Sequence, residues 1–287
     1  MVTTIQSAFD GLRSSLEITG LQSTLVSVRQ QNVRKVIQAS MEVLDDFQTG
    51  SYARSTMIAP LKEADIDILV VFDVKYYPMG PAGLLDATKR ALKKTYTSTP
   101  DISRNGQAVT IRFTDFVVDV VTGFYRTGGG YLIANSITNS WLETDPKAHV
   151  KIFSEANKAH GGKLVPLIKM LKGWNKSHGS FFRSFHIEVL AREILHNVRI
   201  TDYPSGVRFF FDKARSVVKG KNFDPAGYGD DIGSYINTPA KLEEAIRRLQ
   251  TAHDQCLRAE QFALRGQIRD SVDAWRRVFS DYFPAYG

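Results

Sequence analysis

Two aspartates lie one residue apart at the head of an apolar run, in the segment ADIDILVVF (64–72). On a β-strand, residues i and i+2 point to the same face, about 6.6 Å apart, so Asp65 and Asp67 should project together. A third carboxylate, Asp119, lies within the apolar segment FVVDVVTGF (116–124). Carboxylates in apolar strands are costly unless a cation neutralises them. If the two strands are neighbours, the three aspartates supply the oxygen ligands that a pair of Mg²⁺ ions requires.

A Gly-Ser pair, Gly50 and Ser51, precedes Asp65 with thirteen residues between them. Glycine lets a backbone approach anionic oxygens closely, and successive N–H groups can cradle a phosphate, to which Ser51 adds a hydroxyl donor. The alternative is that Gly-Ser is only a helix cap and that the aspartates are turn residues. We favour a triphosphate cradle beside a two-metal site, because the Gly-Ser pair, the Asp-Ile-Asp-Ile run and a third strand aspartate occur together.

Apolar periodicity predicts the elements that must position these residues. In the first half it indicates helices, strands and one basic amphipathic helix, over 5–18 (helix), 21–47 (helix), 65–73 (strand), 84–95 (basic helix), 107–113, 116–124 and 131–134 (strands). Residues 114 and 115 should form a tight turn between two of the strands. The later pattern is helical, with segments at 163–176, 184–197, 240–264 and 268–279.

These elements predict an α+β protein with two lobes. We expect a catalytic lobe over 1–145, built on a mixed twisted sheet and carrying a long N-terminal helix. A helical lobe over 146–287 is expected to close a nucleotide cleft. A chain of 287 residues is long enough for such an arrangement.

Composition narrows the class of protein. The net charge of +7 suits an anionic partner such as a nucleotide, although many soluble proteins are mildly basic for no specific reason. A single cysteine, Cys256, excludes an internal disulfide framework and a zinc site with several cysteines. The N-terminal segment has no apolar signal core and no run approaches the ~20 apolar residues of a membrane helix. We therefore expect a cytoplasmic protein that does not enter a membrane.

The motifs resemble a known family. Gly-Ser followed by Asp-apolar-Asp-apolar and a later apolar-Asp-apolar is the pattern of the polymerase-beta nucleotidyltransferase superfamily. More narrowly, the chain resembles the bacterial CD-NTases, relatives of cyclic GMP–AMP synthase that make cyclic oligonucleotide signals in CBASS anti-phage defence. Four segments carry this resemblance: QTGSYARSTMI (48–58), LVPLIKMLKGWNK (164–176), SFHIEVLA (184–191) and FDP (223–225).

The resemblance implies a function and a metal. It implies a cyclic di- or trinucleotide synthase that uses nucleoside triphosphates and two Mg²⁺ ions, with Mn²⁺ as a substitute, held by Asp65, Asp67 and Asp119. It further implies that Lys169 or Lys172 reaches the phosphates, with Ser184 joining from the next helix. The alternative is that the lysines form only a solvated face.

Three further nucleotide contacts are weaker candidates. Phe185 follows Ser184 where related enzymes carry an aromatic residue that stacks on the donor base, although a core aromatic is an equal alternative. Tyr52 and Arg54 directly follow the Gly-Ser turn, where Arg54 could meet either a phosphate or a surface carboxylate.

Rival functions remain open at this level. One is a template-independent linear polymerase or a transferase that modifies a small molecule, and another is a catalytically silent sensor of nucleotide or nucleic acid. The six histidines show no metal-ligand spacing, so the zinc-bearing insertion of animal cyclic GMP–AMP synthase is absent. The basic helix around Lys89 and Arg90 could contact nucleic acid, but a solvated face explains it better.

A protein partner is a separate hypothesis. In some CD-NTase defence systems a ubiquitin-transfer-like protein conjugates the enzyme through its C-terminus. The segment from Phe283 to Gly287 is interpreted here as a flexible tail that ends in glycine. The sequence does not name the bases that are joined, the linkage, or the activating signal.

Overall fold

The computed structural model describes residues 2–98, 101–229 and 231–287, and the chain forms two compact units. One unit comprises Ile18–Lys151, and the other combines Met1–Glu17 with Ile152–Gly287. The predicted α+β class, with a mixed sheet in the N-terminal half and helices in the C-terminal half, is confirmed.

The Ile18–Lys151 unit is built on one mixed sheet. Five strands run in the order β1-β2-β5-β4-β3, and β6 and β7 extend the sheet from β5. Their bounds are β1 (Val43–Gln48), β2 (Asp65–Phe72), β3 (Asp101–Asn105), β4 (Ala108–Arg112), β5 (Val117–Tyr125), β6 (Tyr131–Asn135) and β7 (Ser140–Thr144). Strands β2 and β5 are parallel, whereas the other pairs are antiparallel. Parallel pairing of β2 with β5 is what places the two aspartate segments side by side.

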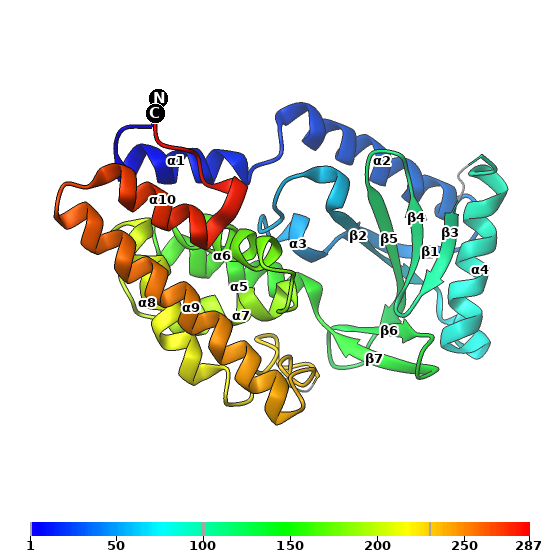
Figure 1. Ribbon diagram of the computed structural model, residues 1–287. Helices are drawn as coiled ribbons and strands as arrows, with labels where there is room; N and C mark the ends of the chain where they lie inside the picture. The colour runs from blue at the N-terminus through cyan, green and yellow to red at the C-terminus, as the bar shows by residue number, and fades with distance from the viewer. Residues whose placement is uncertain (1, 99–100, 230) are drawn as a thin grey trace. The chain divides into compact units, whose positions relative to one another are not determined.

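Two helices, α2 (Gly20–Gln38) and α4 (Gly80–Thr95), cover one face of this sheet (Figure 1). Every second residue of β2, from Ile66 to Phe72, enters the core beneath them and is at most 1% exposed. The alternation predicted for β2 is therefore correct, and the aspartates lie on the other face. On that face Leu69 and Val71 pack with Tyr131 and Ile133 of β6.

The helix expected over 21–47 is wrong beyond residue 38. Residues Val43–Gln48 instead form β1, which pairs antiparallel with β2 through a register irregularity near Val43. Leu44 and Phe47 continued the apolar spacing of the helix, but ladder hydrogen bonds to β2 outweigh that local pattern. Strands β3 and β7 were not predicted from the sequence.

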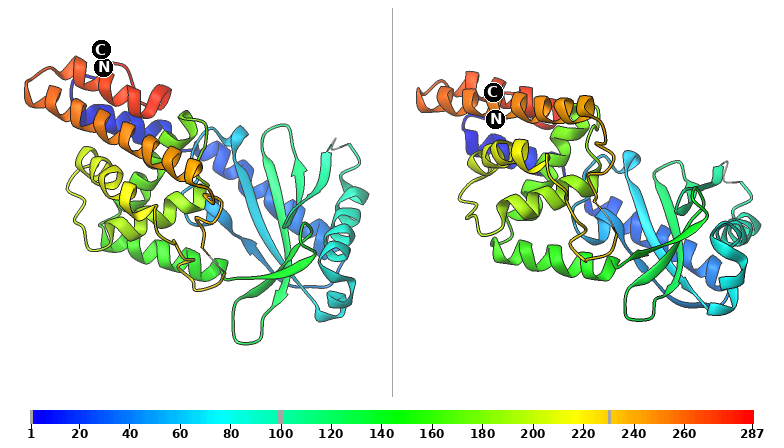
Figure 2. Two further views of the ribbon diagram at one scale, coloured as in Figure 1. Left: turned by 60° about the horizontal axis from the view of Figure 1, so that its bottom comes forward. Right: turned by 90° about the horizontal axis from the view of Figure 1, so that it is seen from below.

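The other unit is helical. Its elements are α1 (Ile5–Ser15), α5 (Pro146–Ala159, which crosses the unit boundary), α6 (Leu164–Ser177), α7 (Ser184–Leu195), α8 (Tyr203–Val217), α9 (Pro239–Leu264) and α10 (Ile268–Phe279). The helices predicted over 163–176, 184–197, 240–264 and 268–279 are confirmed within one or two residues. Helices α9 and α10 pack along each other, as the views of Figure 2 agree. Helix α8 was not singled out from the sequence.

The N-terminal helix corrects the expected division at residue 145. Helix α1 packs with the helical unit, because the ring of Phe9 meets Trp275 at 4.9 Å and Phe283 at 5.2 Å, all of them buried. These aromatic contacts join segments from opposite ends of the chain, which no local pattern reveals.

The C-terminal segment is packed rather than free. Phe283 is 1% exposed, and Pro284 lies against Gly11 of α1. The Gly287 N–H donates to the Val2 carbonyl at 3.1 Å. The prediction of a flexible tail is therefore wrong. In the described part of the chain, no helix is both long and apolar enough to span a membrane.

Candidate active site

Asp67 and Asp119 lie side by side on two neighbouring parallel strands. In the register of β2 and β5, Asp67 pairs with Asp119, and Asp65 pairs with Val117 one step earlier. Paired residues on neighbouring strands point to the same face, as do residues i and i+2 on one strand. The structure thus confirms the strand adjacency on which the three-aspartate prediction depended.

The three carboxylates lie at the edge of the apolar core and not within it. Asp67 and Asp119 are half-buried, whereas Asp65, at the first position of β2, is exposed. Although the Asp65 residue is exposed as a whole, its carboxyl group is partly shielded from solvent by surrounding atoms. This burial, followed by the negative charge of Asp119, raises the pKa of the carboxyl above its ordinary value, against a smaller lowering by Arg112. The site therefore carries like charges that repel one another.

Thr110 of β4 completes this face of the sheet. It pairs with Asp119, and its buried hydroxyl donates to Asp119 Oδ1 at 2.6 Å. This bond fixes the carboxylate orientation and leaves Oδ2 for another ligand. Thr110 was not predicted as a site residue; a polar residue within the apolar segment AVTIR was the available signal.

Gly50 approaches the second aspartate more closely than any other residue type allows. Its φ is +65°, and a Cβ at this position would lie 1.7 Å from Asp67 Oδ2. The neighbouring Thr49 N–H donates to the Asp67 carbonyl at 2.9 Å, which ties the turn to β2. Glycine is therefore required here for two reasons, the left-handed backbone and the contact with a carboxylate.

The rest of the Gly-Ser turn is a short folded loop. Residues Gly50–Ala53 form the four-residue helix α3, after which the Ser51 carbonyl accepts hydrogen bonds from the N–H groups of Thr56 and Met57 at 2.9 and 3.1 Å. The Tyr52 hydroxyl lies 3.0 Å from Ser23 Oγ. Arg54 ends α3, so all four turn candidates lie in the unit that holds the aspartates.

The donor set can be tested against a hard divalent cation. A set of oxygen ligands with a net negative charge fits Mg²⁺ or Mn²⁺ better than a softer metal. Within the described residues no three His, Cys, Asp or Glu side chains are already gathered at metal-binding distances. The three aspartates thus share one face of the sheet without forming a gathered metal-binding cluster.

The two candidate lysines of the helical unit are both buried and both paired. Lys169 Nζ lies 2.6 Å from Glu17 Oε2, a carboxylate that is 46% exposed. Lys172 Nζ lies 3.1 Å from Glu188 Oε1 of α7, and that glutamate side chain is completely buried. The alternative of a solvated lysine face is therefore wrong for these two residues. Glu17 and Glu188 were missed as partners, although Glu188 stands out within the apolar segment SFHIEVLA.

Ser184 and Phe185 begin α7. Ser184 is exposed, and the half-buried Phe185 ring lies 6.2 Å from the Phe153 ring of α5. The buried His186 anchors this turn, with its ring nitrogens 2.8 Å from the Tyr235 hydroxyl and 2.9 Å from Asn222 Oδ1. Residues on either side of the FDP segment thereby contact the first turn of α7.

Comparison with solved structures identifies the fold. E. coli CdnC, solved with ATP, matches 99% of this chain and 99% of its own length with a TM-score of 0.79 at 18% identity. The Vibrio cholerae cyclic AMP-GMP synthase DncV matches 97% of this chain and 87% of its own with a TM-score of 0.68 at 14% identity. The fold is that of the CD-NTase nucleotidyltransferases.

Sequence comparison then gives the family. The model of the SMODS family (Second Messenger Oligonucleotide or Dinucleotide Synthetase domain) matches residues 3–157, and the chain belongs to this family. A probable cyclic nucleotide synthase of Bacillus cereus is 23% identical over 100% of this chain and 99% of its own length. A cyclic AMP-AMP-AMP synthase of Acinetobacter is 29% identical over 62% of this chain and 54% of its own. The resemblance inferred from the motifs is confirmed.

Proposed function

We propose that this protein joins nucleoside triphosphates into a cyclic di- or trinucleotide messenger of anti-phage defence. The observation that carries the proposal is the pairing of Asp67 with Asp119, with Gly50 held against Asp67. Family membership supports the same chemistry. One relative is named as a cyclic AMP-AMP-AMP synthase and another as a cyclic AMP-AMP-GMP synthase, so the proposal does not assign the ring size or the bases.

In the proposed reaction, a ribose hydroxyl of one nucleotide attacks the α-phosphate of another. A new P–O bond forms, the bond to pyrophosphate breaks, and the hydroxyl proton is released; a later intramolecular attack closes the ring. Two Mg²⁺ ions, held by Asp65, Asp67 and Asp119, would activate the hydroxyl and neutralise the leaving pyrophosphate. Thr110 would hold Asp119 in its binding orientation.

The residues of the Gly-Ser turn are proposed to bind the triphosphate. Gly50 and Ser51 would offer N–H and hydroxyl donors to phosphate oxygens. Tyr52 and Arg54 would extend this set along the same turn. In the helical unit, Lys169 and Ser184 are proposed phosphate contacts and Phe185 a base contact, whereas the buried pairing of Lys172 with Glu188 supports a role in holding α6 against α7.

The proposed function is tested by product analysis. The protein is incubated with labelled triphosphates and Mg²⁺, the products are treated with phosphatase, and they are separated on thin layers. A cyclic product has no terminal phosphate, so phosphatase leaves its mobility unchanged, whereas a linear polymer loses its 5′ phosphates and shifts. A nucleotidylated small molecule would form only when that acceptor is added. A product that shifts on phosphatase treatment would favour the linear polymerase. Saturable nucleotide binding without any product would favour the silent sensor.

A regulatory partner is a further part of the proposal. E. coli CdnC was solved in complex with a HORMA protein. A regulatory protein of that kind, or conjugation by a ubiquitin-transfer-like protein, would control the enzyme. Conjugation at Gly287 would require the packed C-terminal segment to detach from α1 first. Intact mass measurement after coexpression with such a partner would detect the conjugate.

A further inference from the structure

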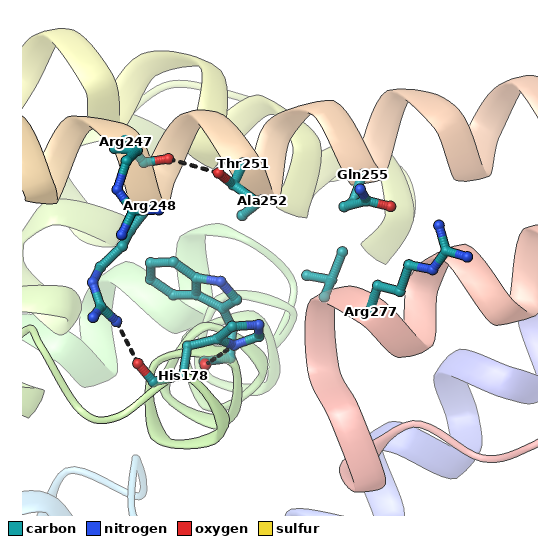
Figure 3. Close-up of a pocket in the computed structure, with 9 residues that line it drawn as sticks. His178, Arg247, Arg248, Thr251, Ala252, Gln255 and Arg277 are labelled. Carbon is teal, nitrogen blue, oxygen red and sulfur yellow. Dashed lines mark hydrogen bonds between the residues drawn. The ribbon is translucent and has the colours of Figure 1, made fainter.

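The helical unit contains a hollow that includes none of the proposed catalytic or nucleotide-binding residues. It has a volume of about 200 Å³, is open to solvent, and is lined by the end of α6 together with α9 and α10. This volume is below that of drug-sized ligand sites, so the hollow has room only for a small ligand. Figure 3 shows Thr251, Ala252 and Gln255 along the side that α9 forms.

One wall of the hollow is aromatic. Trp174 and His178 both line it, with ring centroids 6.1 Å apart and planes inclined by 35°. His178 Nδ1 lies 2.8 Å from the Trp174 carbonyl, an acceptor, so Nδ1 carries a proton and donates. The wall therefore presents flat apolar surface with one polar edge, the Nε2 edge of His178.

The rim of the hollow is positively charged. Arg247 and Arg248 both bond to the carboxylate of Glu244, so a single negative charge serves two guanidinium groups. Arg277 lies on the opposite side, as Figure 3 shows, and its guanidinium has no ion-pair partner among the described residues. Each side of the rim thus carries a surplus of one positive charge, and on the Arg277 side no carboxylate of the described residues is paired with the guanidinium.

We propose that this hollow binds a small aromatic anion, a flat ring that carries a phosphate or a carboxylate. The ring would lie against Trp174 and His178, and the anionic group would bond to Arg277, for which guanidinium geometry suits both phosphate and carboxylate. Helix α6 also carries Lys169, which is a proposed phosphate contact. The ligand would therefore lie at the C-terminal end of the same helix.

Fluorescence titration with 8-anilinonaphthalene-1-sulfonate, an aromatic anion, tests the proposal on the full chain. We expect saturable binding of one dye per chain, weakened at least about tenfold by Arg277→Glu, because a charged hydrogen bond is lost and repulsion is added. Thr251→Phe, which fills the hollow from an exposed position, should weaken binding similarly. Arg90→Glu is the matched control, since Arg90 is an exposed helical arginine outside the hollow.

Competition then identifies the source of the anion. Displacement of the dye by adenosine monophosphate would indicate a nucleotide ligand, and displacement by indole-3-acetate alone would indicate an aromatic carboxylate. Displacement by neither compound would overturn the proposal. Equal dye affinity in Arg277→Glu and Arg90→Glu, with both variants melting as the unsubstituted protein does, would also overturn it. None of these outcomes depends on nucleotide turnover, so they are separable from the proposed synthase activity.

Discussion

Asp67 of β2 and Asp119 of β5 are direct neighbours in the parallel ladder, and the Thr110 hydroxyl holds Asp119 from the next strand. Three adjacent strands therefore present two carboxylates and a hydroxyl on one face of the sheet. Rigid strands keep such a set in place more precisely than loops do.

Replacing Gly50 should disable the enzyme without unfolding it. In Gly50→Ala, the new Cβ would meet Asp67 Oδ2 at 1.7 Å and must displace that carboxylate. We expect product formation to fall at least about a hundredfold, because misplacement of a reacting group by 1 Å costs about that much. Turnover measured beside a thermal melt would check this.

Gly80→Ala is the matched control for the Gly50 substitution. Gly80 also has a positive φ, +70°, but nothing lies within 4 Å of the position that a methyl group would take there. Its ψ of 171° places it in a region of backbone conformation that essentially only glycine occupies, so Gly80→Ala should lose about 1–3 kcal/mol of stability and keep its activity. Equal activity of both variants would contradict the role assigned to the Gly50 contact.

Lys172 should contribute mainly to stability, whereas Lys169 should contribute mainly to triphosphate binding. Lys172→Met removes the positive charge bonded to a glutamate whose side chain is fully buried, so we expect a loss of about 3–5 kcal/mol in the free energy of unfolding. Lys169→Met should cost about 1 kcal/mol or less, because Glu17 is half-exposed, yet it should raise the KM for triphosphate. Urea denaturation and initial-rate kinetics measure the two effects.

The double variant Lys172→Met/Glu188→Leu tests whether the stability lost in Lys172→Met comes from the buried Glu188 carboxylate. With both members of the buried pair replaced by apolar groups, most of the lost stability should return. If Lys172→Met instead left stability unchanged and raised only the KM, Lys172 would be a phosphate contact and the holding role proposed for it would be wrong.

Asp65 should make the stability of the metal-free protein depend on pH. Its pKa is raised in the folded state, so between the ordinary value of 3.8 and the raised value the folded protein binds more protons than the unfolded one. The free energy of unfolding therefore falls as pH rises through that interval, and Asp65 is a net cost at neutral pH.

Melting curves in EDTA across this pH interval test the contribution of Asp65. Asp65→Asn should flatten the decline and raise the melting temperature at neutral pH. Mg²⁺ should raise the melting temperature of the unsubstituted protein more than that of the variant, because the cation relieves the same repulsion. An Asp65→Asn protein that is less stable at neutral pH would show that the carboxylate has a favourable partner instead.

Residue spacing within single segments was enough to predict that the aspartates lie on strands and that Asp65 and Asp67 share a face. The i, i+2 relation placed Asp65 and Asp67 on one face, and the structure confirms that Ile66 and Ile68 fill the core on the other. The apolar run around Asp119 indicated a strand that follows a tight turn at 114–115, and the structure pairs this strand antiparallel with β4. What spacing alone did not supply was the parallel neighbour of β5, which depends on the whole sheet.

The missed features all depend on contacts between distant segments. Glu188 meets Lys172 across two helices, sixteen residues apart in sequence, and Phe9 joins the helical unit through aromatic residues near the other end of the chain. Strand β1 was mistaken for helix because its apolar residues continue a helical spacing. It is a strand because its backbone forms hydrogen bonds with the edge of β2. Periodicity within one segment does not report on such partners.

Product formation by the Asp65→Asn/Asp67→Asn double variant is the decisive measurement. The unsubstituted protein and the variant would be incubated with four labelled triphosphates and Mg²⁺, treated with phosphatase, and compared at equal folded concentration. We predict a phosphatase-resistant product from the unsubstituted protein and a loss of more than about a thousandfold in the variant, because cation binding is removed while the fold is kept. A double variant that still forms the resistant product at a comparable rate would contradict the assignment of these aspartates as the catalytic centre.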